Sequence, residues 1–246
     1  MVRRCWRQGR ARDTDARGFG HQRILGGASS AGVHSGWVPP YRLRPARFGR
    51  KQPNEAGEQP GGATDDQQAH VEHMSLDPVQ IVGTAAGAAP SIDYALSHPE
   101  RLRSLVIADC TGGVQDPEHL EMLERIRPPE FQALPVWLRE VGACYRGANP
   151  EGTRRWIEIA ETSNEEAAAR QRPRNHVTYA LLATLRVPTL AIAGGADQTT
   201  PPIIMRAIAK HIPNCRYEPI AEAGHASFWE QPEVWNHLVL DFIGRQ

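Results

Sequence analysis

The stretch that decides the fold is VQIVGTAAGAAPSIDYALSHPE, residues 79–100. Val79–Val82 is a short apolar run that ends at Gly83, which indicates a buried strand. Small residues follow, and Ile92–Leu96 then has the character of a helix that stops before Pro99. The stretch therefore predicts a strand that turns into a helix within a few small residues.

Further apolar runs repeat this pattern along the chain. Strands are expected at Leu105–Ala108, Pro188–Ala193 and Cys215–Ile220, with helices after Pro201-Pro202 and over Pro232–Ile243. Strands that alternate with helices favour an α/β fold, in which a mostly parallel sheet is covered by helices on both faces. The first two strands and the helix between them should form a right-handed βαβ unit.

Between these runs, residues 116–180 are polar and helical in character. Asp116 is expected to cap a helix that has Pro117 in its first turn, and Pro150 opens another helix. This block predicts a helical cap, inserted at about residues 114–180. Three aromatic residues of the cap are candidates for lining a substrate pocket, although aromatic residues on helices more often belong to the core: Trp137, Tyr145 and Trp156.

Three small-residue segments follow predicted strands at their carboxyl ends, where open α/β sheets bind their ligands. They are Gly83–Gly87, Gly194–Asp197 and Ala223–His225. Their order along the chain is a tight turn, an acid and a histidine. Each site taken alone has a simpler interpretation, since Asp197 could cap a turn and His225 could be an ordinary loop histidine.

That order and context resemble the α/β-hydrolase fold superfamily. Residues 81–106, with the run SHPERLRSLV, resemble the nucleophile elbow, its helix and the next strand; residues 187–202, VPTLAIAGGADQTTPP, resemble the acid strand. AGH at 223–225 followed by EQPE at 230–233 resembles the histidine loop. The resemblance covers about residues 76–246. It implies that His225 transfers protons and that Asp197 fixes its tautomer and stabilises its charged form.

The resemblance also assigns roles within the tight turn. Its flanking glycines, Gly83 and Gly87, let strand and helix approach each other, and Thr84 precedes the central position. The central residue is strained and stands at the start of the helix, where backbone N–H groups can stabilise an oxyanion. By this mapping the N–H of Ala86 is one oxyanion donor.

The central position of the turn is Ala85, where the superfamily has Ser, Cys or Asp. A methyl group cannot attack a carbonyl carbon, so acyl-enzyme chemistry lacks its nucleophile. Two other side chains are candidates to replace the nucleophile. Thr84 should point away from the pocket, and Cys110, at the end of the next strand, is either on the correct rim or a buried structural thiol. Ser91 lies further along the helix and is expected to pack.

What remains is a His/Asp pair beside an oxyanion site, which can act as a general base. The leading hypothesis is a hydrolase-superfamily enzyme acting on a small carbonyl compound such as an ester, a lactone or a β-diketone. A non-hydrolytic lyase that uses the same pair is one alternative. A catalytically silent binding protein with the hydrolase fold is the other.

The amino-terminal part differs in composition from the rest. Residues 1–52 carry 12 Lys and Arg against 2 Asp and Glu, whereas residues 53–246, the expected hydrolase-like domain, carry 16 against 26. No strand pattern is evident before residue 52, so the early strands of the superfamily are expected to be missing or scrambled. The basic Gly/Arg-rich segment is expected to be disordered, to be read out of frame, or to be a genuine basic arm. The second oxyanion donor is unassigned, with Gly26-Gly27 as the nearest candidate.

Composition excludes several other classes. No run of about 18 apolar residues exists, and no secretory signal follows Met1, so neither a membrane-spanning helix nor a membrane partner is expected. The four cysteines are far apart and form no C-x-x-C motif, which favours a reducing, cytoplasmic setting. No cofactor or metal motif is present. The expected partner is a small-molecule substrate rather than nucleic acid, and the oligomeric state stays open.

Overall fold

The computed structural model describes residues 22–26, 41–43, 60–161 and 172–246. Its centre is a sheet in the order β2-β1-β3-β4-β5-β6. The strands are β1 (Gln22–Gly26), β2 (Tyr41–Leu43), β3 (Val79–Thr84), β4 (Leu102–Ala108), β5 (Thr189–Gly194) and β6 (Cys215–Ile220).

The strands β3 to β6 run parallel to one another, as the sequence predicts. Thr84 at the end of β3 is aligned with Ala108 of β4, and Ala108 is aligned with Ile192 of β5. Gly194 at the end of β5 is aligned with Ile220 of β6. The carboxyl ends of these strands therefore share one edge of the sheet, which is where open α/β sheets place their ligands.

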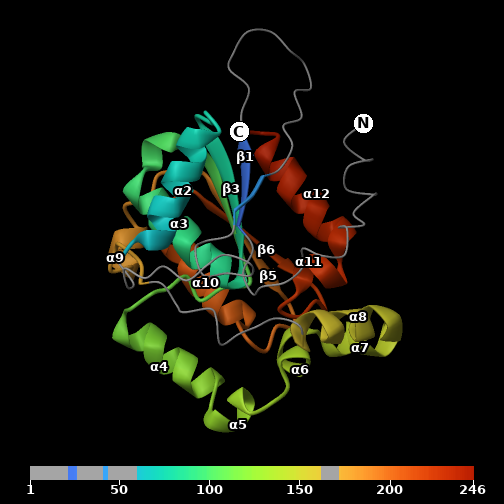
Figure 1. Cartoon of the computed structure of the whole chain (residues 1–246). Coiled ribbons are helices and arrows are strands. Elements are labelled where there is room, and N and C mark those ends of the chain that lie inside the picture. The colour runs from blue at the N-terminus through green and yellow to red at the C-terminus, as the bar shows by residue number, and fades with distance from the viewer. Residues whose placement is uncertain (1–21, 27–40, 44–59, 162–171) are drawn as a thin grey trace.

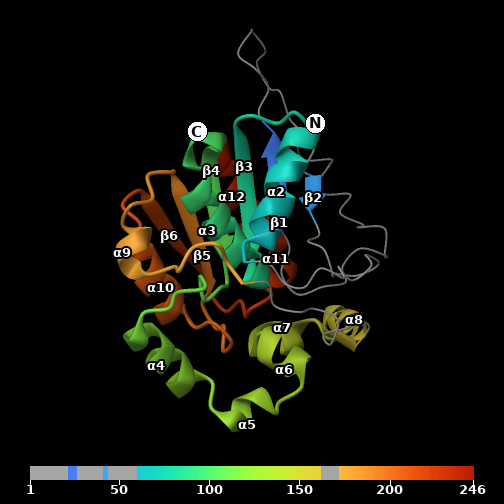
Figure 2. The ribbon, with the colours of Figure 1, turned by 60° about the vertical axis from the view of Figure 1, so that its left-hand side comes forward.

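Helices cover both faces of the sheet, as Figures 1 and 2 show together. On one face lie α2 (Gly62–His73), α3 (Ala88–Ser97) and α10 (Pro202–His211), and on the other lies α12 (Pro232–Ile243). The expected α/β class is thus confirmed. Short helical turns complete this part of the chain: η1 (Ala85–Gly87), η2 (Pro99–Arg101), α9 (Tyr179–Leu182) and α11 (Ser227–Glu230).

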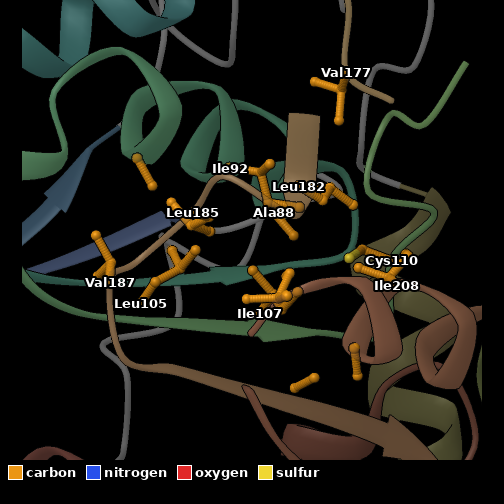
Figure 3. Close-up of a cluster of buried hydrophobic side chains, with 14 of the residues drawn as sticks. Ala88, Ile92, Leu105, Ile107, Cys110, Val177, Leu182, Leu185, Val187 and Ile208 are labelled. Carbon is orange, nitrogen blue, oxygen red and sulfur yellow. The ribbon is translucent and has the colours of Figure 1, made fainter. Parts of the chain in front are cut away.

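Side chains on the central strands alternate between two buried clusters. Leu105 and Ile107 of β4 face the larger cluster under α3 and α10, which Figure 3 shows. Val106 and Ala108 face the smaller cluster under α12. Because successive residues of a strand point to opposite faces, a strand buried on both sides needs an unbroken apolar run. This is why four-residue apolar runs were sufficient to locate the central strands.

The block between β4 and β5 consists of helices, as expected, and it lies beyond the carboxyl edge of the sheet in both views (Figures 1 and 2). Pro117 opens α4, but Asp116 does not cap that helix through its side chain. Its Oδ2 accepts the N–H of Tyr179, at 2.7 Å, and so ties the start of the insertion to its end. The helices are α4 (Pro117–Ile126), α5 (Pro129–Gln132), α6 (Val136–Glu140), α7 (Ala143–Ala148) and α8 (Pro150–Glu161).

The expectation that no strand precedes residue 52 is wrong for two short segments. Strand β1 pairs antiparallel with β3 and with β2, so this side of the sheet is not parallel. Both strands are short and held by backbone pairing, which needs no long apolar run, so the sequence pattern gave little sign of them. The remainder of residues 1–52, and with it the expectation of disorder or a shifted frame, lies outside the described residues.

Helix α2 was also missed, because its buried face is largely polar. Its buried residues, Thr64, Gln67 and Val71, have helical spacing, but only Val71 is apolar. An amphipathic pattern therefore does not appear in the sequence. Across the described ranges, no helix is both long and apolar enough to cross a membrane.

Candidate active site

The turn between β3 and α3 has the strained backbone expected of a sharp strand-to-helix reversal. Thr84 is still extended, with φ −120° and ψ 145°, whereas Ala85 has a φ of +48°. That value lies in the left-handed region, which side chains with a Cβ rarely occupy. The chain then enters η1 and α3 directly. Ala85 is half-buried and Ala86 is exposed.

Gly83 makes this reversal possible because a larger residue would not fit. A Cβ built on Gly83 would lie 2.8 Å from the Cα of Ala88 and 2.8 Å from the carbonyl oxygen of Gly87, and would also collide with the Ser91 hydroxyl. Ser91 donates its hydroxyl to the Gly87 carbonyl at 2.8 Å. The role expected for Gly83, close approach of strand and helix, thus has a direct steric basis.

Asp197 follows β5 in a turn that supplies hydrogen bonds to its carboxylate from within three residues. Its Oδ1 accepts the N–H groups of Thr199, at 2.7 Å, and Thr200, at 2.8 Å. Its Oδ2 accepts the Thr200 hydroxyl at 2.6 Å. Asp197 is 3% exposed, so these bonds replace the water that burial removes.

His225 meets the remaining side of that carboxylate. Its Nδ1 donates to Oδ2 of Asp197 at 2.8 Å, and the Thr200 hydroxyl oxygen lies 3.0 Å from the same nitrogen. In the described ranges, Nε2 of His225 has no hydrogen-bond partner. The structure therefore brings His225 and Asp197 together, with Nδ1 committed to the acid and Nε2 open for a substrate or water.

Charges around the pair shift both pKa values toward the ion pair. Burial alone would raise the pKa of Asp197, but the His225 charge and the hydrogen bonds from His225 and Thr200 lower it. Burial alone would lower the pKa of His225, but Asp197, then Asp109 and Glu140, raise it to about 9. The imidazole is consequently protonated in most molecules at neutral pH.

Asp109 is a buried acid next to this pair that the sequence pattern did not single out. It follows β4 directly, and its Oδ1 accepts the N–H of Gly194 at 2.6 Å. The Ser227 hydroxyl donates to its Oδ2. The available signal was an acid immediately after the buried run Leu105–Ala108, at the edge that also carries Asp197.

The inserted helices contact the histidine loop through backbone and carboxylate groups. The Glu140 carbonyl accepts the N–H of Ala226 at 3.1 Å. Glu230 is buried and accepts two N–H groups, from Gly142 at 3.0 Å and from Gly224 at 2.9 Å. The segment between α6 and α7 is thereby fixed against the loop that holds His225.

The candidate substitutes for a nucleophile are poorly placed for attack. Cys110 is 2% exposed and packs in the larger core cluster (Figure 3). Its Sγ lies 3.7 Å from Sδ of Met205. Burial raises the pKa of its thiol to about 12, so it is not a thiolate at neutral pH. Thr84 is buried, and Ser91 donates to the backbone as a packing residue.

The aromatic residues of the insertion are only partly assembled near the site. The Trp156 ring lies 5.4 Å from the Trp229 ring and 6.1 Å from the Phe228 ring, between centroids, and its Nε1 donates to Oε2 of Glu140 at 3.1 Å. Trp156 thus packs against the helical turn that follows His225. No contact of Trp137 or Tyr145 with the Asp197–His225 pair is seen in the described ranges.

The same ranges contain no group of three or more His, Cys, Asp or Glu able to hold a metal.

A family model for the alpha/beta hydrolase fold matches residues 151–232, which include Asp197 and His225. The match covers 82 of the 246 residues, and solved structures with the α/β-hydrolase fold share the architecture of this chain. The chain is thus similar to α/β-hydrolases, and the relatives below are enzymes by name.

The relatives of this chain are distant in sequence, and the match covers only part of their length. A 2-hydroxy-6-oxononadienedioate/2-hydroxy-6-oxononatrienedioate hydrolase from Paraburkholderia phymatum is 22% identical over 202 residues, which are 71% of this chain and 65% of the relative. The chain thus spans somewhat less than two thirds of that hydrolase.

Two solved structures show the same fold. A thermophilic esterase from Thermogutta terrifontis has a TM-score of 0.67 at 24% identity, covering 84% of this chain and 78% of the esterase. An N-acyl homoserine lactone degrading enzyme has a TM-score of 0.63 at 20% identity, covering 80% of each chain.

Proposed function

We propose that the protein is an enzyme that acts on a small carbonyl compound, such as an ester, a lactone or a β-diketone, with His225 and Asp197 as its proton-transfer pair. The observation that carries the proposal is the 2.8 Å contact from Nδ1 of His225 to a buried, fully hydrogen-bonded Asp197, with Nε2 left open. The names of the relatives support the substrate class, since they include a hydrolase of an oxo acid, an esterase and a lactone-degrading enzyme.

The reaction proceeds without an acyl-enzyme, because Ala85 stands where the attacking side chain would be. Water attacks the carbonyl carbon while its proton passes to Nε2 of His225. The tetrahedral oxyanion is stabilised by the N–H of Ala86, in the turn that serves as the elbow. The bond to the leaving group then breaks, and Nε2 returns the proton to the leaving oxygen or carbon.

Asp197 acts on the imidazole throughout this cycle. Its carboxylate holds the Nδ1–H tautomer, so Nε2 is the nitrogen that exchanges the proton. Its charge also stabilises the imidazolium that forms when water is deprotonated. The inserted helices act as a cap over this edge, held to the histidine loop by Glu230 and the Glu140 carbonyl.

Ala85 favours a second candidate, a catalytically silent protein that binds a ligand at the same edge. The non-hydrolytic lyase uses the same pair and differs from the first proposal in that the pair takes a proton from the substrate and no water is added. A cytoplasmic setting belongs to the proposal as well, supported by Cys110, Cys144 and Cys215 being free thiols.

Turnover of three probes separates these candidates: a phenyl ester, a γ-lactone and acetylacetone. Wild type and His225→Ala are compared, with His237→Ala, an exposed histidine on α12, as the matched control. The enzyme proposal expects turnover that His225→Ala abolishes and His237→Ala retains. A lyase adds no water to a carbonyl, so it would leave all three probes intact and would instead cleave a β-hydroxy ketone into two carbonyl compounds. Binding without turnover, indifferent to His225→Ala, would establish the silent protein and overturn the proposal.

A further inference from the structure

Asp109 is the buried acid of the carboxyl edge that the proposed proton transfer does not use. It is fully buried, and its backbone φ of +49° lies in the left-handed region. A residue with a side chain occupies that region at an energetic cost, although Asp tolerates it better than most. Backbone strain of this kind persists where surrounding contacts over-determine a position.

Those contacts reach both segments that carry the proposed pair. Oδ1 of Asp109 accepts the N–H of Gly194, at 2.6 Å, and Gly194 ends the strand three residues before Asp197. Oδ2 accepts the hydroxyl of Ser227, which lies two residues after His225. A single carboxyl group therefore spans from the acid strand to the histidine loop.

We propose that Asp109 is a positioning residue of the Asp197–His225 pair, holding the strand before the acid and the turn after the histidine at a fixed separation. The contribution of Asp109 to catalysis rests on the proposed function. Asp109 touches neither substrate nor reacting atoms, and it acts through its hydrogen bonds to Gly194 and Ser227 and through its charge near the imidazole.

The same carboxyl group places a second negative charge behind the imidazole. The groups that face His225 are Asp197, Asp109 and Glu140, and all three raise the pKa of the imidazole. Asp109 in turn faces Asp197 and His225. Burial, then the Asp197 charge, raise the pKa of Asp109, while His225, Ser227 and Gly194 lower it, and the result is about 7. Over the range in which His225 titrates, Asp109 is therefore ionised.

Asp109→Asn tests the proposal with little change in shape, because the amide oxygen can still accept from Gly194. The readout is the NMR titration of the His225 imidazole, which a purely structural residue would not move. We expect the pKa of His225 to fall by about one unit in Asp109→Asn, since one facing charge is removed.

Asp93→Asn is the matched control. Asp93 is also buried and hydrogen-bonded, to the Thr64 hydroxyl and to the N–H groups of Arg174 and Asn175, but it is not among the charges that face His225. Its replacement should leave the His225 titration in place. A His225 pKa that is unchanged in a folded Asp109→Asn protein would overturn the proposal.

Ser227→Ala tests the contact of Asp109 with the histidine loop. It also provides a test of the proposal if the Asp109→Asn protein does not fold. It removes only the hydroxyl donor, and we expect the Ala226 amide to exchange with solvent about fivefold faster while the Asn175 amide, held by Asp93, keeps its rate. Unchanged exchange at Ala226 would contradict the proposal.

None of these readouts uses turnover, so the two proposals can fail separately. A protein without any turnover whose His225 pKa falls in Asp109→Asn would retain the positioning role and lose the proposed function. Conversely, the protein could be active while the pKa of His225 is unchanged in Asp109→Asn and the exchange rate of the Ala226 amide is unchanged in Ser227→Ala. That result would support the proposed function and overturn the positioning role.

Discussion

The turn at Ala85 and the Asp197–His225 pair lie at the same edge of the sheet. The turn has the backbone geometry of a catalytic site, whereas the pair has the side chains of one. The turn keeps its backbone, with Ala85 at a φ of +48° and Gly83 packed against Ala88, but it has no reactive side chain. The pair keeps its side chains, joined at 2.8 Å. The strained backbone is therefore imposed by the packing of strand on helix and does not need a nucleophile at its centre.

The largest effect is expected from His225→Ala, which removes the proton acceptor. Turnover of an activated ester should fall by at least about 100-fold, since general base catalysis contributes that much or more. Steady-state kinetics with the His237→Ala control measures it. Equal turnover rates in His225→Ala and His237→Ala would show that the Asp197–His225 pair takes no part in catalysis.

The pH dependence of turnover should follow the charge of His225. Its pKa of about 9 lies above the ordinary value, so the imidazole is protonated at pH 7 and cannot accept a proton from water. The rate should rise about tenfold per pH unit from pH 7 and level off near pH 9. A plateau that begins near pH 6.5 would mean that the neighbouring carboxylates do not hold the proton on the imidazole.

Gly83→Ala should lower the free energy of unfolding by disrupting the turn, without changing the side chains of the Asp197–His225 pair. The added methyl would meet the backbone of Ala88 and Gly87 at 2.8 Å, and overpacking of this kind costs about 1–3 kcal/mol of unfolding free energy. Gly147→Ala is the matched control, because its added methyl would meet nothing within 4 Å and it lies in helix α7. Denaturant unfolding of both variants should give opposite signs, and a tolerated Gly83→Ala would refute the steric account.

The smallest effect is expected from Ala85→Gly, which relieves the left-handed strain. The cost of a side chain at that φ is about 1–2 kcal/mol, and the unfolded-state entropy of glycine offsets part of the gain. We expect a net stabilisation of about 0.5–1 kcal/mol in thermal or denaturant unfolding. Ala148→Gly, at an exposed helix position, should be destabilising by a similar amount.

The sequence was most informative where residues are buried on both sides. Continuous apolar runs located β4, β5 and β6 because a doubly covered strand admits few polar side chains. It was least informative for α2, whose buried positions Thr64 and Gln67 are polar, and for β1, which is held by backbone pairing. Neither feature leaves a hydrophobic period to find.

For the candidate site, the sequence predicted the residues of the pair but not their surroundings. Asp197 and His225 follow strands in an order typical of the superfamily, and the fold brings them together. Asp109 and Glu230 depend on contacts across 85 and 88 residues of sequence, with Gly194 and Gly142, and no local pattern encodes those. Asp116 illustrates the same limit, since a distant N–H took the place of the expected cap.

We propose that the turn at Ala85 is a complete nucleophile elbow that lacks only its nucleophile. Ala85→Ser tests it most directly, by reaction with a serine-directed fluorophosphonate followed by mass spectrometry. We expect wild type and Ala148→Ser to stay unlabelled, Ala85→Ser to be labelled at position 85, and labelling to be lost when His225→Ala is added. A folded Ala85→Ser protein that remains unlabelled would contradict the claim, because a hydroxyl at that position would then lie out of reach of the pair.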